Sequence, residues 1–553
     1  MSGMPALFLI LALGFALRIV GIHFGLPHLY HADEPIVVNH ALAYGAWDFN
    51  PHFFKIPPLV SYLLFTIYGG YYLLGYLTGS FRNVQDFEQL FYSDPSSFYL
   101  LARIVFGACL GTAAVYLLYR LIVKHFSRPH ALLSAFFLAI CFLHVRDSHY
   151  IYADIPLAAV ILIAFCFLLR IAEDKASFKI HFWTGVMIGL AAATKYNGAA
   201  LAFPYLYITC IESERKYILR NALTAFLGAV LAYLILNPFT LLDFPFFLKD
   251  IRAQAKAQGG TGWLHHLNYS LIGAVGLPML IASGLGIVRL LRKFDAKKSA
   301  LAFFLIAYYF ILVFWGQPYD RYVLPMLPFM LFFASDFVLT IPQRLLQVTL
   351  IVLLSVFPLT ASILFDKIML VKDTRTLAKE WVESHIPAGA KLALDGDFYM
   401  PRLSFSRSQL AKKWNDVTQN PGAVSEAQKR KLKYLLSQES SKVPAYELYF
   451  LADEITKERF LYAQPLLPYR REALRERGID YVLFAGIPAK GERLKLYEEI
   501  KRQAAPVVVF NPYQDSSQKF PIDRMAMTGG PFLWKDLVKR NRNGWTIEIY
   551  QLK

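Results

Sequence analysis

The sequence is poor in charged residues and in cysteine. Only 18% of its 553 residues are charged, whereas 56% are hydrophobic. This balance excludes an ordinary soluble protein and indicates a chain that crosses a membrane several times. The few cysteines lie in apolar runs, so no disulfide framework is expected: they are Cys109, Cys141, Cys166 and Cys210. The sequence also lacks a phosphate-binding glycine motif, a nucleophile elbow, internal repeats and low-complexity tracts.

The net charge of +17 does not require a nucleic-acid partner. The sequence has no recognisable nucleic-acid-binding module, and basic residues in membrane proteins mostly mark cytoplasmic loops and lipid headgroup contacts. We therefore expect membrane lipid, and no nucleic acid, around this chain. The first apolar segment has no basic stretch before it and no clear cleavage site before His23, so we expect a retained first span.

Apolar runs predict about eleven transmembrane helices within residues 1–370. A helix needs about 20 apolar residues to cross the hydrocarbon core of a bilayer. The predicted spans are 4–22, 98–120, 131–146, 153–170, 182–194, 198–211, 220–237, 270–290, 300–316, 322–340 and 346–365. Two of them, 182–194 and 198–211, are short and interrupted by Gly or Pro, so we expect them to tilt or to dip into the membrane.

Lysine and arginine set the orientation of these spans. The basic clusters are Arg120, Lys124 and Arg128; Lys175 and Lys179; Arg215, Lys216 and Arg220; and Arg289, Arg292, Lys293, Lys297 and Lys298. If all are cytoplasmic, as the positive-inside rule predicts, residues 23–97 form the first outside loop of a plasma (inner) membrane protein. Residues 57–78 are long enough to span, but a span there would invert every later loop. We therefore interpret them as an interfacial or re-entrant helix of that loop.

The composition changes at Val371. Residues 371–553 are charged and mixed, with one helix-like pattern (TRTLAKEWVESH) and short strand-like runs (KLALDG, YVLFAG, PVVVF, WTIEIYQL). These patterns predict a soluble α/β domain of normal size on the outside. The expected fold class is therefore an α-helical polytopic membrane protein with a C-terminal soluble α/β domain.

The predicted alternation of the spans brings several polar groups to the outer face of the membrane. These are Asp33, Glu34 and Lys55 in the first loop; Arg146, Asp147, His149 and Asp154 in the second; Lys195; and Asp320, Arg321 and Tyr322. Charges at membrane depth are costly unless they are paired or functional. Lysine and arginine neutralise phosphate, and a carboxylate can accept a proton from a nucleophile. The set predicts a site for an anionic, membrane-borne substrate.

A structural role remains open for each of these groups. Lys195 fits a helix-end lysine that extends to the interface. Arg321 fits a helix cap or a pair with Asp320, and Asp154 fits the N-cap of the next helix. Asp147 fits a local ion pair with its neighbour. The histidines match no standard zinc spacing and are interpreted as surface or packing residues: they are His23, His28, His31 and His40.

Several short motifs follow one another along the chain: HADEP, FKIPPL, YADIPL, ATKYNG, DRYVLPMLP and KDTRTLAKEWVESHIPAGAKL. In these motifs and in their order the sequence resembles the GT-C-type glycosyltransferases that use polyprenyl-phosphate sugars. That group includes protein O-mannosyltransferase (family 39-like) and aminoarabinose-transferase relatives. The resemblance implies transfer of a sugar from a polyprenyl-phosphate donor to a protein, lipid or glycan acceptor.

The resemblance also implies roles for single residues. Asp33 corresponds to the proposed catalytic base, Lys55 to a contact of the carrier phosphate and Asp154 to a residue of the substrate cavity. Ile56 separates Lys55 from the Pro-Pro step, whereas some relatives have Lys-Pro directly. A divalent metal is compatible with the resemblance, but the sequence offers no clear ligand set for one, so no cofactor is predicted.

The remaining candidates extend these assignments. Glu34 joins the two aspartates as a catalytic candidate. The donor-phosphate candidates besides Lys55 are Lys195, Arg321 and Tyr322, and the cavity candidates are Arg146, Asp147 and His149. Two other functions stay open: a transporter or flippase for an anionic lipid, and a non-enzymatic assembly protein. Charges at one face instead of the midplane, and the lack of a repeat, favour the transferase over the transporter.

Overall fold

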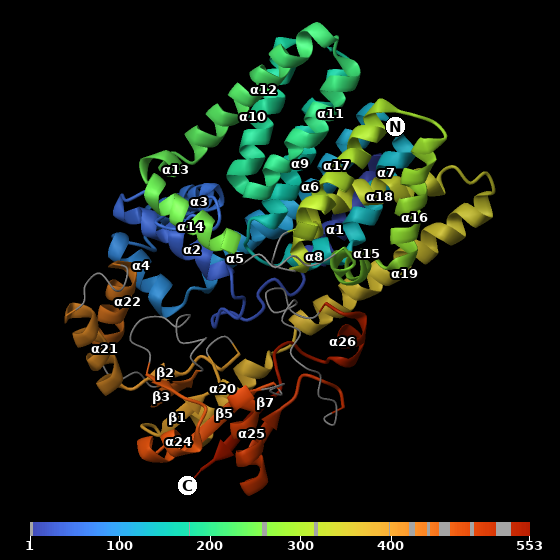
Figure 1. Cartoon of the computed structure of the whole chain (residues 1–553). Coiled ribbons are helices and arrows are strands. Elements are labelled where there is room, and N and C mark those ends of the chain that lie inside the picture. Colours follow the sequence, from blue (N-terminus) through green and yellow to red (C-terminus); the bar gives the residue numbers. More distant parts are fainter. Residues whose placement is uncertain are drawn as a thin grey trace.

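The computed structural model has a helical bundle at one end and an α/β part at the other (Figure 1). It describes residues 4–552, apart from 176, 257–262, 315–318, 397–398, 420–425, 439–442, 453–464, 487–490 and 516–531. Parts of three predicted segments fall outside these residues: the end of the span 300–316, the start of the turn between spans 300–316 and 322–340, and part of the loop 238–269 between spans 220–237 and 270–290. The long helix α19 (Arg344–Met369) leads from the bundle towards the α/β part.

The first loop forms a helical layer at the end of the bundle that faces the α/β part (Figure 1). It follows α1 (Met4–Ile19) and contains α2 (Glu34–Ala43), α3 (Leu59–Leu77) and α4 (Val84–Ser93). Buried apolar residues of α2 and α3 share one core with α5 (Ser96–Ala102). Helix α3 does not appear among the helices that are long and apolar enough to span, which agrees with its interpretation as an interfacial helix.

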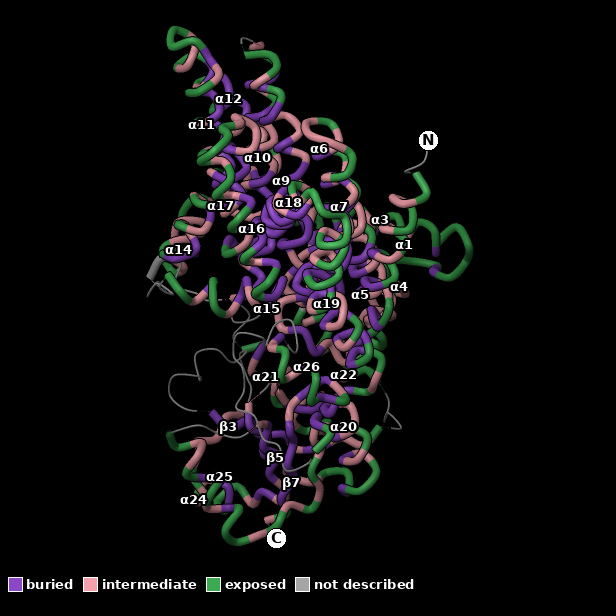
Figure 2. Tube along the Cα trace, turned by 90° about the vertical axis from the view of Figure 1, so that its right-hand side faces the viewer, coloured by how far each residue is buried: buried purple, intermediate pink, exposed green. Residues whose placement is uncertain are grey.

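The bundle contains the remaining helices of the N-terminal two thirds. They are α6 (Leu110–His125), α7 (Arg128–Ile140), α8 (Phe142–Asp147), α9 (Asp154–Leu168), α10 (Phe178–Thr194), α11 (Ala202–Glu212), α12 (Arg215–Leu236), α13 (Phe239–Leu242), α14 (Phe244–Lys256), α15 (Ile272–Val275), α16 (Leu277–Val288), α17 (Ala296–Phe314) and α18 (Leu327–Val338). Shorter turns of helix adjoin them, notably η4 (Tyr196–Leu201) and η7 (Asp320–Met326). A long buried core occupies the centre of the bundle (Figure 2).

Six helical segments in the described part of the chain are long and apolar enough to cross a membrane. They are Ser96–His125, Asp154–Ala172, Arg215–Leu236, Ala296–Phe314, Asp320–Val338 and Arg344–His385. The protein is therefore a multi-pass membrane protein. The other predicted spans coincide with shorter helices, among them α1, α7, α10 and α11, so the count of eleven stays a prediction.

The predicted span 270–290 is not one straight helix. His266–Val275 and Leu277–Leu291 meet at an angle of 106°, so this segment is a broken span or a re-entrant turn. The break lies at Gly276, whose φ of +80° is a conformation that other residues rarely adopt. A Cβ atom there would also lie 2.8 Å from the Phe357 ring. The Gly/Pro sequence GLP therefore bends the chain at this point.

Ion pairs connect the basic loops at the bundle end away from the α/β part. Lys297 contacts Glu173 at 2.7 Å, and Lys175 contacts Glu212 at the same distance. Three loops that the positive-inside rule assigns to one side thus lie on the same side. This arrangement agrees with the predicted orientation and leaves the first loop and the α/β part on the opposite side.

The α/β part contains a mixed sheet in the order β2-β3-β1-β5-β7-β6, with β4 beside β3. Its strands are β1 (Lys391–Leu394), β2 (Ser404–Phe405), β3 (Ala445–Leu451), β4 (Leu466–Leu467), β5 (Tyr481–Ala485), β6 (Val508–Phe510) and β7 (Ile547–Gln551). Strands β1, β3 and β5 pair in parallel, whereas β7 is antiparallel to β5 and β6. The four predicted strands are confirmed as β1, β5, β6 and β7; the sequence analysis missed β2, β3 and β4.

Helices cover both faces of this sheet. Alternate residues of β1 face opposite sides, so Leu392 and Leu394 pack against α20 (Thr374–His385), and Ala393 faces the other core. That second core includes α24 (Arg471–Arg477) and α25 (Gly491–Gln503). Three further helices, α21 (Arg407–Gln419), α22 (Glu426–Ser437) and α26 (Trp534–Lys539), complete the part.

The α/β part is anchored to the first loop close to Asp33. The Arg375 guanidinium at the start of α20 stacks on the Tyr30 ring at 3.9 Å, and the Tyr30 and Thr376 hydroxyls are 3.0 Å apart. Arg375 is held in place by Asp373 at 2.8 Å. The contact joins residues far apart in the sequence and places the α/β part directly over the first loop.

Glycines bring α10 and α12 into close contact. A Cβ atom at Gly185 would lie 2.0 Å from the Ala225 carbonyl oxygen, and one at Gly228 would lie 2.5 Å from the Phe182 carbonyl oxygen. Lipid supplies little hydrophobic driving force between helices, so close backbone packing through small residues is their main attraction. The opposite face of α12 exposes large apolar residues, as a lipid-facing surface would. Because α10 ends at Lys195, this packing also sets the position of that lysine.

We expect Gly185→Ala to destabilise the bundle by about 1–3 kcal/mol, because the added methyl group forces α10 and α12 apart. Gly284→Ala is the matched control, since Gly284 is also a mid-helix glycine but has open space around its Cβ position. It should leave stability unchanged or raise it by up to about 1 kcal/mol through helix propensity. Thermal unfolding of both variants in detergent tests this, and equal melting temperatures would contradict the packing argument.

Candidate active site

Four charged side chains form a row at the end of the bundle that faces the first loop. Arg321 contacts Asp33 at 3.0 Å and Asp154 at 3.6 Å, and Asp154 contacts Lys195 at 2.5 Å. Acid and base alternate along the row, and every side chain in it is at most 17% exposed. The structure thus brings together four of the residues selected from the sequence, from four distant segments.

Asp33 occupies the N-cap position of α2 but does not cap it. Its side chain makes no cap hydrogen bond with the first turn of the helix. Its Oδ2 atom is buried and meets Arg321 as an ion pair outside hydrogen-bond geometry. The carboxylate is therefore directed at the charged row, and its lone pairs are not used to stabilise the helix.

Asp154 likewise does not act as the N-cap of α9. It is the first residue of that helix, the preceding cap position is Ala153, and no side-chain cap bond is present there. Its Oδ1 atom instead accepts a hydrogen bond from Lys195. Burial lowers the pKa of the Lys195 ammonium, an effect that Asp154 partly offsets.

Aromatic rings surround the two cations of the row. Lys195 lies 4.7 Å from the centre of the Tyr322 ring and 5.5 Å from that of Tyr152. Arg321 lies 4.9 Å from Tyr152 and 4.6 Å from Tyr319. Such rings attract cations while excluding water, which strengthens charge interactions inside the site. The sequence analysis selected Tyr322 but missed Tyr152.

Glu34 points away from this row. Its two carboxylate oxygens accept hydrogen bonds from Arg103 at 2.8 and 2.6 Å, and the Ile151 amide donates to it at 3.0 Å. Glu34 and Arg103 are fully enclosed, and Arg103 also donates to the carbonyls of Ile22 and Phe24. Glu34 thus fixes the chain around Asp33. The sequence analysis missed Arg103, which lies inside an apolar span.

His31 holds the turn that contains Asp33. Its Nδ1 atom accepts hydrogen bonds from the Asp33 amide at 3.2 Å and the Glu34 amide at 3.3 Å. Its ring stacks on Tyr150 at 4.3 Å. Burial, and then the neighbouring arginines, hold the pKa of His31 well below its usual range, so the ring stays neutral and can accept. The interpretation as a packing histidine is consistent with this geometry.

Arg146 holds the start of η7, the turn of helix that contains Arg321. It donates to Asp320 at 2.7 and 3.0 Å and to Asp147 at 3.0 and 2.8 Å. Asp320 in turn accepts a hydrogen bond from the Arg321 amide at 2.7 Å. The local ion pair of Arg146 with Asp147 is therefore present. Asp320 also pairs with Arg146, so the Arg321 side chain pairs with Asp33 and Asp154 instead of with Asp320.

Phe532 of the α/β part covers Arg146. The Arg146 guanidinium lies 5.0 Å from the centre of the Phe532 ring, which also stacks on Phe142. The ring is fully buried, and a Cβ atom at Gly273 would lie 2.2 Å from it. The α/β part thus contributes Phe532 and Leu537 to the bundle core, which no sequence motif indicated.

His149 lies outside the row. Its ring nitrogens lie 3.0 Å from the Val145 carbonyl oxygen and 2.8 Å from the Val20 carbonyl oxygen, and its Nε2 is 3.5 Å from Asp366. The ring connects α1, α8 and α19 inside the bundle. This position makes His149 a packing residue in the structure instead of part of an open cavity.

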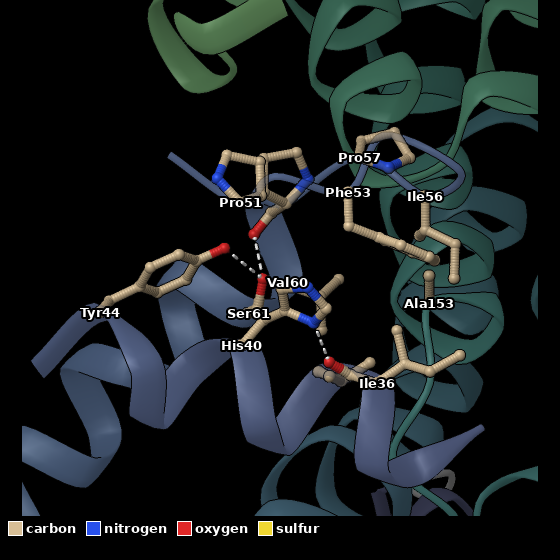
Figure 3. A pocket seen from close by; sticks show the side chains of 12 residues that line it. Ile36, His40, Tyr44, Pro51, Phe53, Ile56, Pro57, Val60, Ser61 and Ala153 are labelled. Atoms are coloured by element: carbon tan, nitrogen blue, oxygen red, sulfur yellow. Dashed lines mark hydrogen bonds between the residues drawn. The ribbon is translucent and has the colours of Figure 1, made fainter. Parts of the chain in front are cut away.

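Lys55 extends from the first loop next to a small cavity of about 20 Å³. Figure 3 shows this cavity between α2 and the 51–58 segment, with Ala153 on its far side. Ala153 directly precedes Asp154, so the Lys55 segment borders the row. The Lys55 side chain itself is exposed and lies 5.9 Å from the Phe53 ring centre.

The donor atoms of the site do not fit a metal ion. Among the residues that the structure describes, no group of three His, Cys, Asp or Glu side chains is close enough to hold one. The two site carboxylates are each held by a cation instead.

A family model and solved structures resemble this chain. The model of dolichyl-phosphate-mannose-protein mannosyltransferase matches residues 47–250. This range contains Lys55, Asp154 and Lys195, whereas Asp33 and Arg321 lie outside it. No curated protein matches the chain.

Among solved structures, ArnT from Cupriavidus metallidurans bound to undecaprenyl phosphate has a TM-score of 0.51 at 12% identity. The match covers 98% of this chain and 97% of that chain. The apo state of ArnT gives a TM-score of 0.51 at 11% identity, over 99% and 98% of the two chains. AglB, an oligosaccharyltransferase from Archaeoglobus fulgidus in complex with an inhibitory peptide and a dolichol-phosphate, gives 0.49 at 11% identity, over 88% and 69%.

These findings confirm the resemblance to GT-C-type glycosyltransferases and the predicted fold class. The chain shares the ArnT fold over nearly its whole length. The family match over residues 47–250 supports a glycosyltransferase, and the ArnT structures share the fold of this chain.

We expect Glu34→Gln to destabilise the protein by about 3–5 kcal/mol, because it leaves the Arg103 guanidinium buried without a counter-charge. Thermal unfolding of purified variants measures this. The double variant Glu34→Gln/Arg103→Met removes the unpaired charge and should recover part of the loss. If Glu34→Gln unfolds at the wild-type temperature, Glu34 has no anchoring role.

Proposed function

We propose that this protein is an integral membrane glycosyltransferase that acts at the extracytoplasmic face. It moves a sugar from a polyprenyl-phosphate donor to an acceptor nucleophile. The observation that carries the proposal is the row in which Arg321 joins Asp33 and Asp154, with Lys195 beside it. The row combines a carboxylate for proton transfer with cations for a phosphate, beside the membrane surface where a lipid donor arrives.

Lys55, Lys195 and Arg321 bind the donor phosphate in this proposal, and Tyr322 encloses it. A guanidinium can hold two phosphate oxygens at once, and the two lysines add point charges. Support comes from the ArnT structure that contains undecaprenyl phosphate, whose fold this chain shares. The carrier phosphate of the donor has the same chemistry.

Donor binding changes the partners within the row. In the structure, both aspartates are neutralised by Arg321 and Lys195. An arriving donor phosphodiester competes for these cations, because its two anionic oxygens can bind a guanidinium as a carboxylate does, and a second negative charge develops on it as the bond to the sugar breaks. Asp33 then loses part of its counter-charge and becomes a stronger base at the moment when the donor is in place. The row thus couples donor binding to activation of the base.

The transfer step itself is a single displacement. Asp33 accepts the proton of the acceptor hydroxyl or amine as the nucleophile attacks the anomeric carbon. The bond between that carbon and the phosphate oxygen breaks, and the leaving polyprenyl phosphate is stabilised by the cations that hold it. Attack from the face opposite the leaving group inverts the anomeric configuration. Asp154 keeps Lys195 and Arg321 directed at the phosphate.

The other sequence candidates support the site from outside it. Glu34 fixes the Asp33 turn through Arg103, and Arg146 fixes the Arg321 turn through Asp320. Asp147 and His149 belong to the same supporting layer. The acceptor is a protein, lipid or glycan, and the α/β part over the first loop is suited to select it. A flippase would need a polar path across the bilayer, whereas this row lies at one end of the bundle.

Asp33→Asn should reduce transfer to background while leaving folding intact, because asparagine cannot accept the proton. Purified protein in lipid vesicles would receive radiolabelled polyprenyl-phosphate sugars and a crude acceptor extract, and label in product would be measured. Asp94→Asn, an exposed acid of the same loop, is the control and should retain activity.

If Asp33→Asn retains most of the activity, Asp33 is not the general base. Movement of intact lipid across the bilayer without product would favour the flippase instead. NMR of the glycosidic product provides the second readout: retained anomeric configuration would contradict direct displacement.

A cysteine at Lys372 tests the proposed orientation. Lys372 is exposed and lies at the start of the α/β part. Lys372→Cys in a cysteine-free background should therefore react with an impermeant thiol reagent added to intact cells. Lys293→Cys, in the densest basic cluster, should react only after the membrane is opened. The reverse pattern would place the α/β part and the site in the cytoplasm.

A further inference from the structure

We propose that Asp250 on α14 is a positioning residue that holds Lys55 in place for the donor phosphate. The inference rests on the proposed function, in which Lys55 binds that phosphate. Helix α14 lies in the 238–269 loop, far from the first loop in sequence. It carries no residue that the sequence analysis selected.

Asp250 is bonded directly to the segment that bears Lys55. Its Oδ2 atom accepts a hydrogen bond from the Phe54 amide at 2.7 Å, and the carboxylate is buried. One turn further along α14, the Gln254 side chain donates to the Lys55 carbonyl oxygen. A carboxylate bond to a backbone amide is charge-assisted and stronger than a neutral one. The two contacts therefore fix the backbone on both sides of the Phe54–Lys55 peptide bond.

The same face of α14 also encloses Phe54. The Phe54 ring meets Phe247 edge-on at 5.8 Å and Phe246 at 6.2 Å. Residues 246 and 247 lie four and three positions before 250, and 254 lies four positions after it, so all four flank one helix face. Phe54 is 1% exposed, whereas Lys55 points outward. The buried phenylalanine thus anchors the segment and directs the next residue away from it.

The segment is also bonded to the turn that follows Lys195. The Tyr196 hydroxyl donates to the Phe54 carbonyl oxygen at 2.8 Å, and Tyr196 directly follows Lys195. Phe54 is thus held between α14 and the turn that carries Lys195. This shared contact sets Lys55 and Lys195 in a fixed relation, which two cations need if they are to bind one phosphate.

The segment needs such support because its backbone is unfavourable by itself. His52 has a φ of +45°, a left-handed conformation that residues with a Cβ atom rarely adopt. Asp243, just before α14, accepts a hydrogen bond from Asn50 at 2.8 Å and lies 3.9 Å from the His52 ring.

The experiment compares Asp250→Leu, Asp250→Asn, Gln254→Leu and Lys55→Ala in the full-length protein in lipid vesicles. Lys249→Gln is the control, because Lys249 lies on the exposed face of the same helix. Hydrogen–deuterium exchange of the backbone amides of residues 49–56 reports positioning without any need for activity. Kinetics with a radiolabelled polyprenyl-phosphate sugar give KM and kcat for the donor.

Asp250→Leu should accelerate exchange in 49–56 and raise the donor KM about ten-fold, the factor expected when one charge-assisted hydrogen bond is lost. The value of kcat should change little. Asp250→Asn keeps an acceptor oxygen and should restore most of both readouts. Gln254→Leu should act in the same direction more weakly, which covers the case in which Asp250→Leu fails to fold. Added to Lys55→Ala, Asp250→Leu should have no further effect on KM.

Unchanged exchange in Asp250→Leu and Gln254→Leu would overturn the positioning role. Faster exchange with an unchanged donor KM would also overturn the proposal. In that case Lys55→Ala identifies the error: if it too leaves KM unchanged, the donor-phosphate role of Lys55 in the proposed function is wrong. If Lys55→Ala raises KM, the proposed function stands and only the role of Asp250 is lost.

Discussion

Everything around the candidate site depends on one guanidinium shared between two buried carboxylates. Arg321 reaches Asp33 on one side and Asp154 on the other, and each of these residues lies at the start of a different helical segment. Buried charges are strongly destabilising when a partner is missing. The three segments must therefore meet within a narrow range of positions, and the arrangement of the helix ends follows from this requirement. Lys195 closes the row and makes it electrically neutral before any donor arrives.

A common pattern places the residues of this row. Asp33 and Arg321 each have a sequence neighbour that is bonded elsewhere: Glu34 beside Asp33 is held by Arg103, and Asp320 beside Arg321 is held by Arg146. One residue of each pair anchors the backbone, and the other faces the site. The lysines follow the same pattern, since the residues next to Lys195 and Lys55 are hydrogen-bonded to each other. Precision thus comes from neighbours that take no part in the chemistry.

The sequence predicted the fold class and the members of the row, because hydrophobic length and charge placement report membrane topology directly. It could not separate Asp33 from Glu34, since adjacent acids look alike until Arg103 shows which one is anchored. Arg103 itself was missed because a lone arginine in an apolar run resembles a helix-end residue. The bend at Gly276 and the contacts of Asp250 and Phe532 depend on packing between distant segments, which no local pattern encodes. Strand β3 was also overlooked, although its run AYELYFL is typical of a strand.

The order in which a ribosome makes the chain has a consequence for the charged row. Asp33 and Asp154 enter the membrane region early, and Lys195 follows soon after the second of them, whereas Arg321 is made much later and Phe532 later still. During synthesis Asp154 can pair with Lys195 as soon as both are made. Asp33 has no ion-pair partner from the row until the segment that contains Arg321 is inserted. A half-made bundle therefore exposes an uncompensated acid at the membrane surface, and only the nearly complete chain hides it. That feature distinguishes unfinished molecules from finished ones.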